Sequence, residues 1–201
     1  MKDKKWKNEK KLEGLAAEIR ICTKCSLYKS RVKAVPGEGD PKARIFLIGE
    51  SPGRDENRTG RPFVGRAGKF LDEMLVASKI EREELFITNV VKCHPPENRD
   101  PRREEVRICI TNYLFNQISL IDPRIVVLLG RHPTSVFFPE IEKMSDVHGK
   151  IIKKYDLIFI ILYHPALAIH RQDLKDVLRK DFKNISKALT MVSLQKNEIM
   201  L

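Results

Sequence analysis

Four cysteines have the chemistry, and in part the spacing, of ligands to a single metal centre. Cys22 and Cys25 form a C-x2-C pair, whereas fifteen residues separate Cys93 from Cys109. Four thiolates suit either a tetrahedral zinc ion or a [4Fe–4S] cluster. Zinc sites usually contain two closely spaced pairs, so the wide second pair favours iron–sulfur slightly. The alternative is that Cys109 is a core cysteine on an apolar helix face and that Cys93 is incidental.

A glycine-rich segment, GESPGRDENRTGRPFVGRAG between Gly49 and Gly68, has the composition of a ligand cradle. Glycine and proline directly after a strand let backbone N–H groups approach a ligand closely. The segment lacks both the G-x-G-x-x-G of dinucleotide-binding proteins and the Gly-Lys-Ser/Thr of a P-loop. It also holds three carboxylates and one aromatic residue, which are Glu50, Asp55, Glu56 and Phe63. The alternative is that the three carboxylates are solvated loop charges and that the phenylalanine belongs to the core.

Short apolar runs alternate with longer amphipathic stretches, a pattern typical of βαβ units. The expected strands are Arg44–Ile48, Phe86–Val91, Ile125–Leu129 and Leu157–Leu162. The expected helices are Lys10–Ile21, Gly65–Ser78, Arg102–Ile121 and Asp173–Leu189. We predict one domain over residues 1–201, with an α/β fold: a three-layer α/β/α sandwich around a central, mostly parallel four-stranded sheet. Residues 1–9 are expected to form a mobile basic arm, and residues 191–201 a disordered tail.

Polar residues follow the predicted strands at the point where each one ends. The Gly49–Gly53 turn follows the first strand, Asn89 lies near the end of the second, Asn98 comes after it, and His164 follows the fourth. Ligands of open α/β sheets bind outside the carboxyl ends of the strands. We therefore expect these residues to gather at one site.

Charge and hydropathy exclude several classes of protein. Lys and Arg number 38 against 27 Asp and Glu, a net charge of +11, which suits a polyanionic partner. Residues 1–33 alone carry eleven basic and four acidic residues, so the excess could equally belong to a solvated tail. No apolar run approaches the ~20 residues of a membrane span, and the N-terminus lacks a signal-peptide core. Four cysteines are too few for a secreted disulfide scaffold, so a cytoplasmic protein is expected.

Taken together, these residues resemble family 4 uracil-DNA glycosylases, the iron–sulfur branch of the uracil-DNA glycosylase superfamily. The similarity runs from about Cys22 to Asp181 and rests on several motifs in one order. They are the C-x2-C pair, GESPGRDE followed by GRPFVGRAG, TNVVKCHPPENRDP, the later cysteine, and YHPA. The HPA tripeptide alone is unspecific, but its combination with four matching cysteines is specific. The resemblance implies a monofunctional enzyme that releases uracil from DNA in base excision repair, leaving an abasic site without strand cleavage.

The resemblance also implies a role for each motif. A [4Fe–4S] cluster would be held by Cys22, Cys25, Cys93 and Cys109. The catalytic residues would be Glu56, which handles the attacking water, and His164, which faces uracil O2. The substrate-binding residues would be Glu50, Ser51, Gly53, Phe63, Asn89 and Asn98. Among these, Phe63 would stack on the extruded base and Asn89 would bond to its Watson–Crick edge.

By the same resemblance the partner is uracil-containing DNA, single- or double-stranded, whose target base must leave the helix at a cost of a few kcal/mol. The loop after His164 offers Leu167 as a wedge for the vacated space, with His170 and Arg171 near phosphates; simple packing under the last helix is the alternative. We expect a monomer associated with the nucleoid. The apolar end of the tail, 199–201, makes a replication clamp a candidate partner, although its spacing differs from the usual clamp-binding pattern.

Two departures from the family pattern stand out. Ser51 replaces the usual Gly or Ala, and its side chain would lie near the water. The loop Pro96–Pro101 lacks the basic insertion of the branch that stays covalently attached to DNA, so turnover is expected. Two other functions remain open: a non-catalytic nucleic-acid-binding module stapled by iron–sulfur or zinc, and, less favoured, a redox protein.

Overall fold

The computed structural model describes residues 2–198 and contains one six-stranded sheet. In spatial order the strands are β1 (Glu38–Gly39), β3 (Leu85–Asn89), β2 (Ile45–Gly49), β4 (Ile125–Leu129), β6 (Leu157–Leu162) and β5 (Ile151–Lys154). The four central strands are parallel, and β1 and β5 pair antiparallel at the two edges. The predicted parallel core is confirmed, but the predicted number of four strands is wrong because it omits both edge strands.

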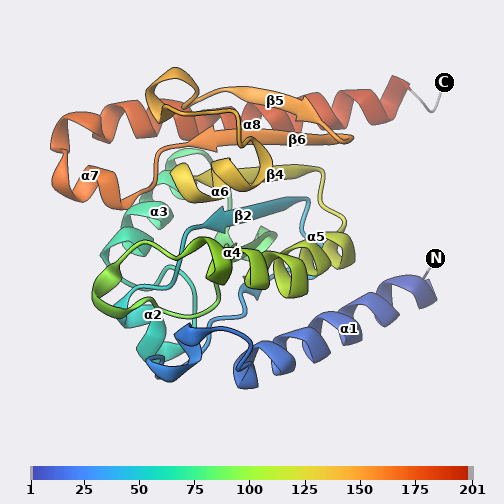
Figure 1. Cartoon of the computed structure of the whole chain (residues 1–201). Helices are drawn as coiled ribbons and strands as arrows, with labels where there is room; N and C mark the ends of the chain where they lie inside the picture. Colours follow the sequence, from blue (N-terminus) through green and yellow to red (C-terminus); the bar gives the residue numbers. More distant parts are fainter. Residues whose placement is uncertain (1, 199–201) are drawn as a thin grey trace.

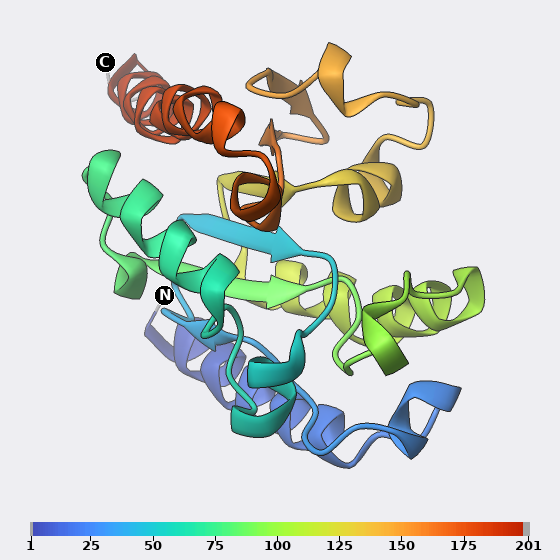
Figure 2. The same cartoon turned by 90° about the vertical axis from the view of Figure 1, so that its left-hand side faces the viewer.

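Helices cover both faces of the sheet (Figures 1 and 2). Leu12 and Ile19 of one helix and Tyr113 of another pack on the face that presents Phe46 and Val126. The opposite face packs against three other helices, one of which is short. In chain order the α-helices are α1 (Lys2–Ile21), α2 (Arg54–Thr59), α3 (Arg66–Ala77), α4 (Arg103–Cys109), α5 (Phe115–Ile121), α6 (Arg131–Phe137), α7 (Ala166–His170) and α8 (Lys175–Glu198). The first face carries α1, α4 and α5, and the second carries α3, α7 and α8, which confirms the three layers.

Several boundaries differ from the predictions. Helix α1 begins at Lys2, so residues 2–9 of the segment expected to form a basic arm are helical. The single helix expected over 102–121 contains a π-helical turn, Ile110–Leu114, between α4 and α5. Helix α8 runs to Glu198, through much of the expected tail. The apolar end proposed for a clamp, 199–201, lies outside the described residues, and no helix within 2–198 is both long and apolar enough to cross a membrane.

The carboxyl ends of the parallel strands define the functional edge. Strands β2 and β3 run in parallel register, with Gly49 beside Asn89 at their ends, and their arrowheads point to the same side in Figure 2. Strand β6 ends at Leu162, two residues before His164. The sheet therefore brings the glycine-rich turn, Asn89 and His164 to one edge, as ligand sites of such sheets require.

Candidate active site and cysteine centre

Glu56 is fixed on the short helix α2, which begins directly after the glycine-rich turn. Its side chain is 8% exposed, and its Oε1 accepts hydrogen bonds of 2.8 Å from the backbone N–H groups of Val64 and Gly65. A Cβ atom at Gly53 would lie 2.6 Å from the other oxygen, Oε2. Glycine at 53 therefore lets this carboxylate approach the turn while two backbone donors hold it in place.

Phe63 lies between the turn after β2 and His164. Its ring stacks on the His164 imidazole with centroids 5.8 Å apart and an interplanar angle of 30°. A Cβ atom at Gly49 would lie 2.5 Å from Phe63 Cζ and would also collide with Asn89 Oδ1. Phe63 adopts a left-handed φ of 50°, a conformation that costs a non-glycine residue of order 1–3 kcal/mol. The predicted residues Phe63, Asn89 and His164 thus share one site.

Asn89 is the last residue of β3 and carries an unsatisfied acceptor. The residue is 1% exposed, and within residues 2–198 its buried Oδ1 has no hydrogen-bond partner. A buried polar atom left in this state costs about 1–3 kcal/mol. Each such atom in a native protein calls for an explanation, and here the atom lies beside the Phe63 ring. Asn89 is therefore ready to accept a hydrogen bond from a ligand.

His164 is held as a neutral imidazole. Its Nδ1 accepts a hydrogen bond of 3.1 Å from the backbone N–H of Ala166, which assigns the remaining ring proton to Nε2. Burial lowers the pKa of His164 to about 4, although the negative charge of Glu56 opposes this effect. At neutral pH the ring therefore presents Nε2–H as a neutral donor.

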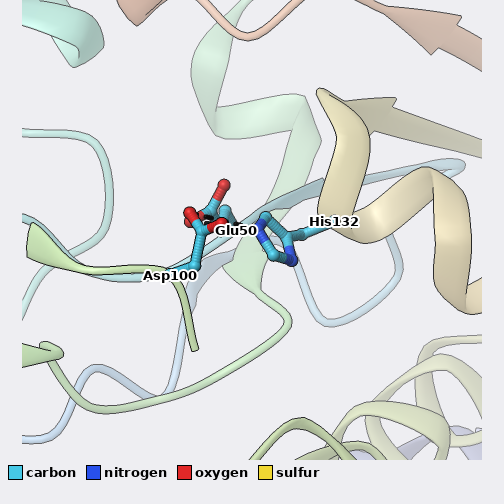
Figure 3. A group of neighbouring side chains, drawn as sticks. All are labelled: Glu50, Asp100 and His132. Carbon is cyan, nitrogen blue, oxygen red and sulfur yellow. Dashed lines mark ion pairs between the residues drawn. The ribbon is translucent and has the colours of Figure 1, made fainter. Parts of the chain in front are cut away.

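Glu50 lies in a group of polar and charged side chains beside the turn after β2. Figure 3 shows its carboxylate beside His132 and Asp100, with His132 Nε2 at 3.6 Å from Glu50 and 3.4 Å from Asp100. Burial raises the pKa of Glu50. Because Arg131 also pairs with Asp100 at 2.6 Å, the group is a local ion-pair network that ties the turn after β2 to the start of α6.

The other predicted residues lie around this site with looser constraints. Ser51 is half-buried in the turn, whereas Asn98 is exposed on a 3-10 turn, Pro96–Asn98, with a left-handed φ of 56°. The segment after His164 is the short helix α7 rather than a loop. On it Leu167 is half-buried and His170 exposed. Arg171 is exposed and pairs with Asp173 at 2.7 Å, which partly neutralises the cation predicted to contact DNA.

The four cysteines line one cavity between α1, α4 and the end of β3. Cys22 follows α1, Cys25 precedes a 3-10 turn, Cys93 follows β3, and Cys109 ends α4. All four are free thiols. The cavity is completed by Ile19, Tyr28, Arg31, Lys92, Ile108 and Tyr113. Cys93 and Cys109 are both buried in the core, as the alternative expects, but they also line the same cavity as the C-x2-C pair, as a shared four-thiolate centre requires.

The surroundings of the sulfur atoms are arranged for an anionic centre. Burial raises the pKa of Cys93 and raises that of Cys109 to about 12, so without a metal these thiols stay protonated. Two cations adjoin the cavity. Arg31 Nη1 donates to Cys93 Sγ at 3.3 Å, and Lys92, itself 1% exposed, has its pKa lowered to about 7 by burial.

Several residues of these sites were not predicted from the sequence, among them Arg31, Lys92 and His132. Arg31 and His132 lie in segments with no motif of their own. Lys92 interrupts the apolar run Val90–Cys93, and this interruption is the one signal that could have identified a buried lysine. Arg31 and His132 contact residues far away in the chain, and the contacts of Lys92 depend on the conformation at the end of β3.

Comparisons with known proteins agree with this geometry. The sequence profile of the uracil DNA glycosylase superfamily matches residues 36–189. A type-4 uracil-DNA glycosylase of Sulfurisphaera tokodaii is 45% identical over 183 residues, covering 87% of this chain and 83% of the relative. Those of Archaeoglobus fulgidus and Thermotoga maritima are each 44% identical, covering 87% and 93% of this chain and 91% and 97% of the relatives. The resemblance drawn from the motifs is confirmed: the chain belongs to the uracil DNA glycosylase superfamily and, within it, to the type-4 uracil-DNA glycosylases.

Proposed function

We propose that this protein is a uracil-DNA glycosylase that hydrolyses the N-glycosidic bond of uracil in DNA. It releases free uracil and leaves an abasic site, the first step in base excision repair of deaminated cytosine. The names and the 44–45% identity of the relatives support this function. The observation that carries it is the buried Asn89 Oδ1, which lies beside the Phe63 ring and has no hydrogen-bond partner among residues 2–198.

Recognition of uracil follows from the donors and acceptors at the end of β3. Asn89 Oδ1 suits the N3–H of uracil, and the amide nitrogen of the same side chain suits uracil O4. Cytosine presents the opposite pattern at positions 3 and 4, so it would leave buried groups unpaired at about 1–3 kcal/mol each. Phe63 supplies an apolar face on which an extruded pyrimidine stacks.

Bond cleavage requires stabilisation of two opposite charges. Negative charge develops on the departing base, and the Nε2–H of neutral His164 is a donor suited to uracil O2. Positive charge develops on the deoxyribose, and the Glu56 carboxylate suits both that charge and the orientation of a water molecule. Because backbone N–H groups occupy Glu56 Oε1, Oε2 is the oxygen left for the water.

The cysteine centre fits a [4Fe–4S] cluster on Cys22, Cys25, Cys93 and Cys109. The four cysteines line one cavity, and the wide C-x15-C spacing of the second pair favours a cluster over a zinc ion. When bound, the cluster would supply a structural cross-link joining α1 and α4 to the end of β3.

Contacts with DNA are proposed around the same edge of the sheet. Leu167 on α7 would enter the space left by the extruded base, and His170 and Arg171 would lie near phosphates. Cations near the turn, which are Arg54, Arg58, Arg61, Arg66 and Lys69, would add salt-dependent affinity. We propose that the protein acts as a monomer on single- and double-stranded DNA.

A fluorescent duplex with one uracil tests the proposal directly. Incubation followed by hot alkali should cleave the strand at the uracil position, because alkali breaks abasic sites. A matched duplex with cytosine at that position is the control and should stay intact. An intact uracil strand, together with tight binding, would instead favour a non-catalytic binding module. Iron and sulfide analysis of the same sample separates a cluster from zinc.

A further inference from the structure

Lys92 is a buried cation that touches both the cysteine centre and the strand carrying Asn89. Its Nζ donates hydrogen bonds of 2.7 Å to Thr88 Oγ1 and to the backbone carbonyl of Asn89. The same residue lines the cavity formed by the four cysteines. Thr88 and Asn89 are the last two residues of β3, so Lys92 connects this cavity to the uracil-recognition residue.

The position of Lys92 calls for a nearby anion. A buried ammonium group is unfavourable unless it is paired and hydrogen-bonded. Lys92 directly precedes Cys93 in the chain and lines the cavity that holds all four cysteines. Four thiolates around a metal cluster would supply the missing negative charge at this cavity.

Arg31 provides an internal comparison, because it adjoins the same centre from another direction. Its guanidinium donates to Cys93 Sγ at 3.3 Å and to the carbonyls of Cys22 and Arg20 at 2.6 Å and 3.0 Å. These partners all belong to the cysteine region, whereas Lys92 also binds the end of β3. A comparison of variants at the two residues therefore separates an effect on the cluster alone from an effect on the base pocket.

We propose that Lys92 is a positioning residue that couples the cysteine centre to uracil recognition. The anionic centre holds the ammonium, the ammonium fixes the Asn89 carbonyl, and this contact aims the Asn89 amide at the base. The inference rests on the proposed function and deepens it. The cluster then does more than cross-link α1, since its charge also maintains the recognition geometry.

The test compares Lys92→Met and Arg31→Met with the wild type. Each protein is titrated with two duplexes, one carrying 2′-fluoro-2′-deoxyuridine, which resists hydrolysis, and one carrying a tetrahydrofuran abasic analogue. The ratio of the two affinities measures the contribution of the base alone. Iron and sulfide content and the reduction potential of the cluster are measured on the same samples.

Both variants should lower the reduction potential, because each removes a positive charge beside the cluster. Only Lys92→Met should reduce the base-dependent affinity ratio, by about tenfold, the usual effect of losing a hydrogen bond to a charged group. An unchanged ratio in Lys92→Met with the cluster retained would overturn the inference. A wild-type ratio near one would instead contradict the proposed function itself.

A second variant keeps the inference testable if Lys92→Met fails to retain iron. Thr88→Val preserves the ammonium and removes one of its two anchors. It should lower the base-dependent ratio two- to threefold while iron and sulfide stay at wild-type levels. A wild-type ratio in Thr88→Val would count against coupling through Lys92.

Discussion

Replacing Glu56 by Gln and by Ala should separate its chemical role from its structural one. In Glu56→Gln the amide oxygen can still accept the hydrogen bonds from Val64 and Gly65, both 2.8 Å long. The amide nitrogen then replaces Oε2 near Gly53, so negative charge disappears while the loop keeps its anchor. In Glu56→Ala the charge and both hydrogen bonds disappear together.

The two variants therefore have different expected magnitudes. Loss of the carboxylate should slow uracil release by about 10²- to 10⁴-fold in both, the usual contribution of a general base. Glu56→Gln should lose no more than about 1 kcal/mol of stability. Glu56→Ala leaves two backbone donors without partners at about 1–3 kcal/mol each, so its free energy of unfolding should fall by about 2–4 kcal/mol, allowing for partial rehydration.

Single-turnover release of uracil from a labelled duplex gives the rate, and urea unfolding gives the stability. Binding to a duplex with 2′-fluoro-2′-deoxyuridine serves as the control and should persist in Glu56→Gln. A Glu56→Gln variant with the wild-type rate would refute the assignment of Glu56 to the chemistry. Equal stability of the two variants would refute its anchoring of the loop.

Three further outcomes follow from the same geometry. Folding holds the pKa of His164 at about 4, below the ordinary 6.5, so stability is lost as pH falls below 6.5, by up to about 3 kcal/mol near pH 4. In urea titrations across this range, the free energy of unfolding of His164→Gln should fall less steeply with decreasing pH than that of the wild type. An equally steep fall would contradict the assignment. Cys109→Ser should abolish visible absorbance and lower Tm, because α1 loses its cross-link; a variant with full iron content would argue against ligation by Cys109. Wild-type protein mixed with uracil-containing DNA should give no denaturation-resistant adduct on a gel, whereas a stable adduct would show capture rather than turnover.

The central fold was predictable because its strands are buried on both faces. Runs such as Ile125–Leu129 are continuously apolar, and this is the pattern of a parallel sheet covered on both sides. The edge strands carry no such signal, since β1 has two residues and β5 is only half-buried. The early start of α1 was also missed. Asn8 donates to the Leu120 carbonyl at 3.2 Å, a tertiary contact that no local pattern reveals.

The site was predictable where residue type and strand position coincide. Asn89 and His164 both lie at strand ends, where ligands of α/β sheets bind. The neutral state of His164 could not be predicted, because it depends on the Ala166 N–H and on burial. The contacts of Lys92 were equally invisible, since the sequence does not show which buried side chains share a cavity.

The most direct test of the account is a crystal structure of this protein bound to a duplex that carries 2′-fluoro-2′-deoxyuridine. The account predicts an extruded uracil stacked on Phe63, with N3–H donating to Asn89 Oδ1 and O2 accepting from His164 Nε2. A uracil that stays in the helix, or that enters the protein while Asn89 Oδ1 remains unpaired, would contradict it.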